Sequence, residues 1–223
     1  WSGDSDINNI TKKIAGNFIT QLIKRKNPAS KTLRNIASDI GSLFSWAEGR
    51  GYIDRNPFYR LNLPKVKKKT SNRRPWSKEN IILFLKNENI RKDEFSATVI
   101  AMFSGMRLSE ICDQKNQNVF DDCFHIYQGK TYSAARVIPI HPIIKPLVKV
   151  LVSKSIDGYL IEGLVPGGYD KKRSWNFQKR LGRRRDKIGL PKGNVFHSLR
   201  NTFATMLENL GVPRNHISQL MGH

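Results

Sequence analysis

Residues 101–111 read Ala-Met-Phe-Ser-Gly-Met-Arg-Leu-Ser-Glu-Ile, and they pass from an apolar helix into a tight turn. Gly105 tolerates the left-handed backbone that commonly ends a helix, so the helix is predicted to stop there. Arg107 then lies in the turn, and a new helix is predicted to begin near Ser109. This geometry projects a guanidinium group from a rigid corner of the fold. Taken alone, Arg107 is more typical of an arginine in a surface ion pair than of a functional residue.

A second informative stretch, His197-Ser-Leu-Arg200, opens another predicted helix. Helical spacing places His197, Arg200 and Ala204 on one face of that helix. The opposite face carries the apolar residues that should hold the helix to the core: Leu199, Phe203, Met206, Leu207 and Leu210. His197 and Arg200 are therefore predicted to lie side by side and to point away from the core. Without further context they could also be an ordinary surface pair.

Together the two stretches resemble the conserved boxes of tyrosine recombinases of the phage integrase type. Ser-Gly-Met-Arg107-Leu-Ser-Glu110-Ile is similar to the first box. His197-x-Leu-Arg200 is similar to the second box, together with the residues that follow it: Thr202-Phe203-Ala204-Thr205, Gly211 and Leu220-Met221-Gly222-His223. Their order and separation also agree, and the resemblance covers about residues 10–223.

The resemblance implies a role for each site residue. Arg107 and Arg200 would grip the non-bridging oxygens of a DNA phosphate, and Glu110 would support the site. Lys130, which precedes an Arg-x-x-Pro strand, would be the general acid, although a lysine that only binds phosphate or is only exposed is the alternative. His197 would accept a proton from the attacking tyrosine, and His223 would donate a hydrogen bond to the same phosphate.

The attacking tyrosine is the main departure from the family pattern. The family places it shortly after the Gly-His pair, and the sequence stops at His223. All tyrosines present precede His197, and none fits: Tyr52, Tyr59, Tyr127, Tyr132, Tyr159 and Tyr169. The nucleophile is therefore expected to be truncated or not represented, so the chain as given should bind DNA without cleaving it. The alternative is a protein that naturally lacks this tyrosine.

The composition favours a nucleic-acid partner. Lysine and arginine total 39 residues against 18 acidic ones, which gives a net charge of +21. Such an excess attracts polyanions, whereas a merely solubilising surface would not need so much self-repelling charge. No stretch approaches the roughly 18 apolar residues of a membrane-spanning helix, so no membrane partner is expected. Cys112 and Cys123 lack metal-ligand spacing, and neither a metal nor another cofactor is predicted.

The pattern of helices and strands predicts an α+β fold that is mainly helical. Residues 1–63 contain helices over 11–26 and from a Ser30 cap to about Glu48, and they resemble part of a helical, SAM-like core-binding domain. Residues 76–223 would be the catalytic domain, with a small antiparallel sheet within 118–140 and a hairpin turn over 128–134. Its helices are expected at 77–86, 95–104, 142–153, 172–187, 198–210 and 214–221.

Basic clusters outside the boxes are candidate phosphate contacts. Residues 64–75 form a proline-bounded linker, predicted to track a DNA backbone through Lys65, Lys67, Lys68, Lys69, Arg73 and Arg74. Two further clusters are Lys171, Lys172 and Arg173, and Arg183, Arg184 and Arg185. A solvated connector and solvated helix faces are the alternatives.

The sequence thus predicts a site-specific recombinase or integrase of a mobile element, acting on double-stranded DNA in the bacterial cytoplasm and associated with the nucleoid. By resemblance it would work as a homotetramer on paired sites, while the chain as given could be a monomer. Two alternatives remain: a non-catalytic DNA-binding module that kept the fold, and a type IB topoisomerase-like enzyme.

Overall fold

The computed structural model describes residues 6–63, 74–127 and 135–222. The chain divides into two compact units, Trp1–Thr70 and Ser71–His223, and each is described by itself. The division falls inside the predicted linker. The linker cations Lys65, Lys67, Lys68, Lys69 and Arg73 lie outside the described residues, whereas Arg74 is described and exposed.

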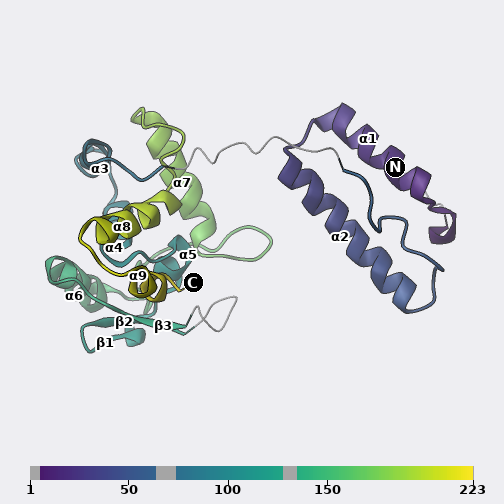
Figure 1. Cartoon of the computed structure of the whole chain (residues 1–223). Helices are drawn as coiled ribbons and strands as arrows, with labels where there is room; N and C mark the ends of the chain where they lie inside the picture. The colour runs from purple at the N-terminus through teal and green to yellow at the C-terminus, as the bar shows by residue number, and fades with distance from the viewer. Residues whose placement is uncertain (1–5, 64–73, 128–134, 223) are drawn as a thin grey trace. The chain divides into compact units, whose positions relative to one another are not determined.

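The first unit is built on two helices, α1 (Lys12–Lys26) and α2 (Ser30–Gly49), after a 3-10 turn, η1 (Ile7–Asn9). Figure 1 shows the two helices running alongside each other. Their shared core consists of Ala15, Phe44, Ala47, Ile53 and Phe58. The predicted Ser30 cap is wrong: Ala29 takes the cap position without a side-chain hydrogen bond, and Ser30 is already helical. Both helices otherwise span the predicted residues closely.

The second unit begins with three helices, α3 (Lys78–Leu85), α4 (Lys92–Ser104) and α5 (Leu108–Asp113). Ser77 caps α3 as predicted, since its hydroxyl accepts a hydrogen bond from the backbone of Asn80. Helix α4 begins three residues earlier than predicted. The Glu94 carboxylate accepts a hydrogen bond at 3.2 Å from the backbone N–H of Arg91, and this satisfies a donor at the helix start.

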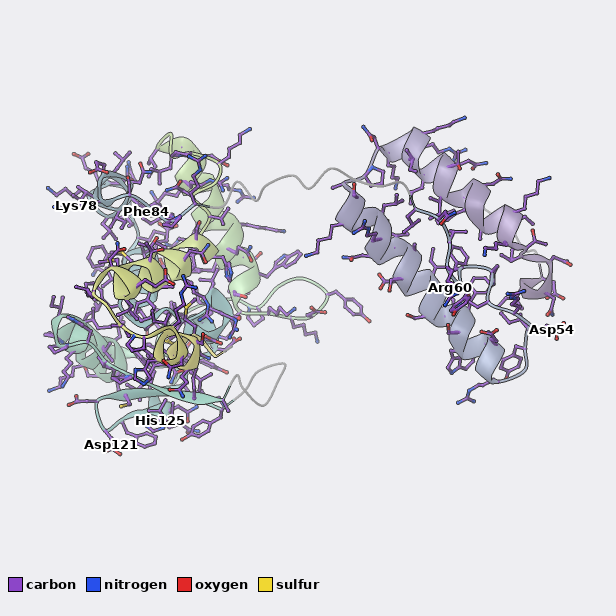
Figure 2. The ribbon with its side chains drawn as sticks, viewed as in Figure 1. Asp54, Arg60, Lys78, Phe84, Asp121 and His125 are labelled. Carbon is purple, nitrogen blue, oxygen red and sulfur yellow. The ribbon has the colours of Figure 1, made fainter. Side chains whose placement is uncertain are left out.

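A three-stranded antiparallel sheet follows in the order β1 (Val119–Phe120), β2 (Cys123–Ile126), β3 (Arg136–Pro139). The short 3-10 turn η2 (Asn116–Asn118) leads into it. Phe124 pairs with Ile138, and both side chains are buried, which fixes the register. Asp121 and His125, labelled in Figure 2, mark the β1–β2 turn and strand β2. The predicted hairpin turn at 128–134 lies outside the described residues.

The remaining elements are η4 (Pro142–Ile144), α6 (Lys145–Lys154), α7 (Ser174–Lys187), α8 (His197–Asn209) and α9 (Arg214–Met221). Helix α8 packs on α4, and α9 contacts both α8 and strand β3 (Figure 1). This packing brings the start of α8 and the end of α9 close to the α4–α5 turn. The architecture is the predicted α+β fold. Among the described residues, no helix has the length and apolar character needed to cross a membrane.

One predicted helix face is wrong. Met206 and Leu210 were expected in the core, but they are 52% and 78% exposed, whereas Arg200 is buried. Helix α8 therefore packs through its first turns, around Leu199, and its later residues lie at the surface. An apolar stripe predicts a helix face, but the length over which that face is covered depends on the neighbouring elements.

Candidate active site

Arg107 lies where the sequence predicts, in the turn between α4 and α5. Gly105 ends α4 with a left-handed backbone (φ 63°), and Arg107 is the N-cap residue of α5. The backbone N–H of Arg107 donates to Glu110 Oε2 at 2.8 Å, and its Nη1 donates to Glu110 Oε1 at 2.6 Å. Glu110 thus fixes both the backbone and the guanidinium of Arg107. The Arg107 side chain remains 32% exposed, so it reaches solvent from this fixed base.

Arg200 reaches the same corner from α8, but from inside the fold. The residue is only 2% exposed, and its guanidinium donates to the carbonyl groups of Gly105 and Met221. Burial, followed by the nearby charge of Arg107, lowers the pKa of Arg200 to about 10. The group therefore still carries its positive charge at neutral pH. The prediction that Arg200 points away from the core is corrected: the side chain is buried, and Nη1 and Nη2 each donate to a backbone carbonyl.

Arg136 is a third arginine of this cluster, and sequence reasoning missed it. Its side chain, 6% exposed, comes from the first residue of β3. Nη1 and Nη2 bind the two oxygens of Glu110 at 3.1 and 2.8 Å, and Nε donates to the carbonyl of Leu220 at 2.7 Å. The signal that could have found it is the Arg-Val-Ile-Pro strand, which follows Lys130 in the sequence.

Glu110 is the anion around which these cations gather. Its side chain is 8% exposed and contacts both Arg107 and Arg136. Burial alone would raise the pKa of Glu110, but the hydrogen bonds from Arg136 and Arg107 outweigh burial and hold it below the usual value. Glu110 is therefore ionised at neutral pH and offsets part of the repulsion between the arginines.

The end of α9 is held by all three arginines. The carbonyls of Leu220, Met221 and Gly222 accept hydrogen bonds from Arg136, Arg200 and Arg107, the last at 3.3 Å. The final carbonyls of a helix have no partner within the helix and form the negative end of its dipole. Three cations from α5, β3 and α8 satisfy this end, so the cluster also anchors the chain leading to His223.

His197 and Arg107 line the same pocket of about 380 Å³, which Ser109 and Asn194 also line. His197 is exposed at the first position of α8, while Arg200 lies one turn further on in the interior. The structure thus brings Arg107, His197 and Arg200 to one corner, with Arg107 and His197 facing the pocket. Lys130 and His223 lie outside the described residues.

The predicted phosphate-binding clusters divide into exposed and internal side chains. Lys171, Lys172 and Arg183 are exposed. Arg173 instead donates to the carbonyl of Cys112 at 3.0 Å and stacks on the Tyr159 ring at 3.7 Å.

Arg184 also has an internal partner, whereas Arg185 pairs with an exposed neighbour. Arg184, 12% exposed, binds the fully buried Glu94, and Arg185 binds Asp186 at 2.6 Å. The exposed cations of the two clusters are therefore the candidate DNA contacts. In the stretches 6–63, 74–127 and 135–222, no three His, Cys, Asp or Glu side chains are grouped to hold a metal ion.

Comparison with solved structures identifies the class of fold. Lambda integrase (75–356), solved as a dimer bound to a COC′ core site, superposes with a TM-score of 0.75 at 19% identity, covering 99% of this chain and 81% of that one. Tn1549 transposon integrase, solved with transposon right end DNA, gives 0.71 at 21% identity, covering 99% and 80%. The chain thus has the fold of these integrases.

The family follows from the sequence comparison. The model of the phage integrase family matches residues 77–223, and the chain belongs to that family. A tyrosine recombinase of Thermosipho africanus is 24% identical over 228 residues, covering 97% of this chain and 77% of the relative. Tyrosine recombinase XerA of Thermococcus onnurineus is 28% identical over 213 residues, covering 92% and 71%.

Proposed function

We propose that this chain is the DNA-cleaving part of a site-specific recombinase that breaks and rejoins strands through a 3′-phosphotyrosyl intermediate. One observation carries the proposal: Arg107, Arg200 and His197, from two distant stretches of sequence, meet at one corner beside a pocket. The family membership and the tyrosine recombinases among the relatives point to the same reaction.

The two catalytic arginines would bind the scissile phosphate. In the reaction a tyrosine hydroxyl attacks phosphorus, a 3′-phosphotyrosyl bond forms, and the 5′-oxygen leaves. Negative charge grows on the non-bridging oxygens, and guanidinium groups can stabilise it with paired hydrogen bonds. Arg107 is partly exposed and fixed by Glu110, so it is placed for this contact. Arg200 would add a second positive charge from its buried position beneath Arg107.

Proton transfer would involve residues around the pair of arginines. His197 faces the pocket and would accept the proton of the tyrosine, whose hydroxyl has a pKa of about 10 in water. Lys130 would protonate the leaving 5′-oxygen, and His223 would donate a hydrogen bond to the phosphate. The two latter roles rest on the family resemblance, since both residues lie outside the described ranges.

The nucleophile would be a tyrosine encoded after His223. Five of the six tyrosines are described, and none of these five lines the pocket that Arg107 and His197 share. Tyr159, for example, lies beneath the Arg173 guanidinium. Reading the gene for a tyrosine within a short distance of His223 is the simplest check.

Double-stranded DNA would be the substrate, bound by the net charge of +21. The exposed cations Arg74, Lys171, Lys172 and Arg183 and the linker lysines are the proposed phosphate contacts. Lambda integrase has been solved as a tetramer bound to a Holliday junction, and this protein would likewise assemble as a homotetramer on paired sites, whereas the 223-residue chain could be a monomer. The activity would take place on DNA of the bacterial cytoplasm, at the nucleoid.

A nicked suicide DNA substrate tests the proposal. The gene product extended past His223 should form a protein–DNA adduct that survives SDS, and the 223-residue chain should bind DNA without one. An adduct on the 223-residue chain would show that an upstream tyrosine is the nucleophile. No adduct from the extended protein at its site would favour a non-catalytic module. Relaxation of any plasmid without site preference would favour a type IB topoisomerase.

A further inference from the structure

Arg136 connects three elements of the catalytic unit through one side chain. It extends from β3, binds Glu110 of α5 with both terminal nitrogens, and binds the carbonyl of Leu220 in α9 through Nε. Each of its three nitrogens therefore donates to an internal acceptor. With 6% exposure, the side chain lies beneath the surface on which a phosphate would bind.

The contacts of Arg136 continue to Arg107. Glu110 uses the same two oxygens for the backbone N–H and Nη1 of Arg107, at 2.8 and 2.6 Å. Arg107 also donates to Gly222, two residues after the carbonyl that Arg136 holds. Arg136, Glu110 and Arg107 thus form a continuous chain of bonds that both begins and ends on the last turn of α9.

We propose that Arg136 is a positioning residue for the phosphate site: it fixes Glu110 and the end of α9, and so sets where the Arg107 guanidinium lies. This inference rests on the proposed function. Arg136 itself does not touch the DNA.

The physical reason lies in the planar geometry of the guanidinium group, which presents paired N–H donors. A bidentate guanidinium fixes the plane of the carboxylate that it binds, whereas a lysine supplies a point charge without that plane. Without Arg136, the buried Glu110 keeps its ion pair with Arg107 and can rotate towards it. The carbonyl of Leu220 also loses a donor. Misplacement of a catalytic group by about 1 Å is enough to slow a reaction about 100-fold.

The test uses the extended gene product and three variants, Arg136→Gln, Arg136→Lys and a matched control, Arg184→Gln. Arg184 is a suitable control because it is also a mostly buried arginine bound to a buried glutamate, Glu94, and neither residue lines the pocket of Arg107 and His197. Three quantities are measured for each variant: melting temperature, DNA affinity, and the single-turnover rate of adduct formation at saturating suicide substrate.

Arg136→Gln should slow adduct formation about 100-fold at saturating DNA and leave DNA affinity nearly unchanged. Arg136→Lys should recover only part of the rate. Arg184→Gln should lower the melting temperature about as much as Arg136→Gln does. While folded, however, it should cleave at close to the wild-type rate. The inference is overturned if Arg136→Gln cleaves like wild type, or if Arg184→Gln loses as much cleavage.

A second measurement does not depend on cleavage. In the 223-residue chain, the NMR signal of the Arg107 Nε–H group should shift in Arg136→Gln and stay in place in Arg184→Gln. If wild-type protein forms no adduct but this shift occurs, the proposed function fails and the link from Arg136 to Arg107 stands. An unchanged Arg107 signal in Arg136→Gln contradicts the link whatever the wild-type protein does.

Discussion

Arg107 and Arg200 donate hydrogen bonds to neighbouring carbonyls, those of Gly222 and Met221, at the end of α9. Two like charges held at one point repel each other, and this contributes to the lowered pKa of Arg200. Glu110 and the negative end of the helix dipole offset that repulsion. The site therefore carries concentrated positive charge before any phosphate arrives.

Arg200→Lys should reduce cleavage far more than DNA binding. Lysine keeps the charge but cannot donate to Gly105, Met221 and a phosphate oxygen in fixed directions. Loss of one such donor costs about 100-fold in rate, to be measured as single-turnover adduct formation in the extended protein. Arg91→Lys, at an exposed position that is not a proposed DNA contact, serves as the control and should leave the rate unchanged. Equal losses of rate and affinity in Arg200→Lys would contradict the catalytic role.

Glu110→Gln should destabilise the chain in a pH-dependent way. The folded pKa of Glu110 lies below its usual value of 4.5, because the hydrogen bonds from Arg136 and Arg107 outweigh burial. The carboxylate therefore stabilises the fold fully above pH 4.5, and that contribution is lost as pH falls through the lower folded pKa.

At pH 7 the variant should lose about 3 kcal/mol of unfolding free energy, as expected for breaking a buried ion pair. Denaturant titrations of wild type and Glu110→Gln between pH 7 and 3 measure the difference. The difference should be constant near neutral pH and shrink in the acid range. A difference independent of pH would show that the charge of Glu110 does not matter.

Arg183→Gln and Arg184→Gln remove the same charge from adjacent residues of α7, yet one should affect DNA binding and the other stability. Arg183 is exposed, so its loss should weaken DNA binding and lower the slope of log affinity against log salt by about one. Arg184 pairs with the buried Glu94, so its loss should cost about 3 kcal/mol of stability and leave the salt slope unchanged. Fluorescence anisotropy and thermal melting distinguish the two outcomes. Identical behaviour of both variants would contradict the distinction between an exposed Arg183 and an internally paired Arg184.

Gly105→Ala should destabilise the α4–α5 turn. Gly105 has φ 63°, and an added Cβ would lie 2.4 Å from the Phe203 ring on α8. Strain and overpacking together should cost more than about 2 kcal/mol, measured by denaturant unfolding. Gly189→Ala is the matched control, because φ is 74° there but no atom lies within 4 Å of the added Cβ. The smaller loss of unfolding free energy in Gly189→Ala measures the backbone strain alone. Equal losses in the two variants would mean that Phe203 moves aside freely.

Local signals predicted most of the framework. Gly105 was predicted to end a helix, Ser77 to cap one, and each has that role in the structure. The β-branched and aromatic residues of 118–140 likewise predicted the antiparallel sheet. Capping and turn formation depend on residues within one or two turns of the chain, so they can be read from sequence.

Side-chain partners across the fold could not be read in the same way. Arg184 was expected at a DNA surface, and it binds Glu94, a residue 90 positions earlier. Arg173 was expected there too, and it bonds to the backbone of α5. An arginine in a basic cluster has the same local pattern whether its guanidinium meets solvent or an internal carboxylate.

The sequence by itself determined which residues could meet at the site, because the two boxes hold Arg107, His197 and Arg200 at the ends of helices. Only the tertiary structure decided how they meet: Arg107 and His197 beside a pocket, Arg200 beneath them, and Arg136 joining Glu110 to the end of α9. Helix ends are fixed by local backbone chemistry. In contrast, packing between distant segments fixes which partners the three arginines and Glu110 find.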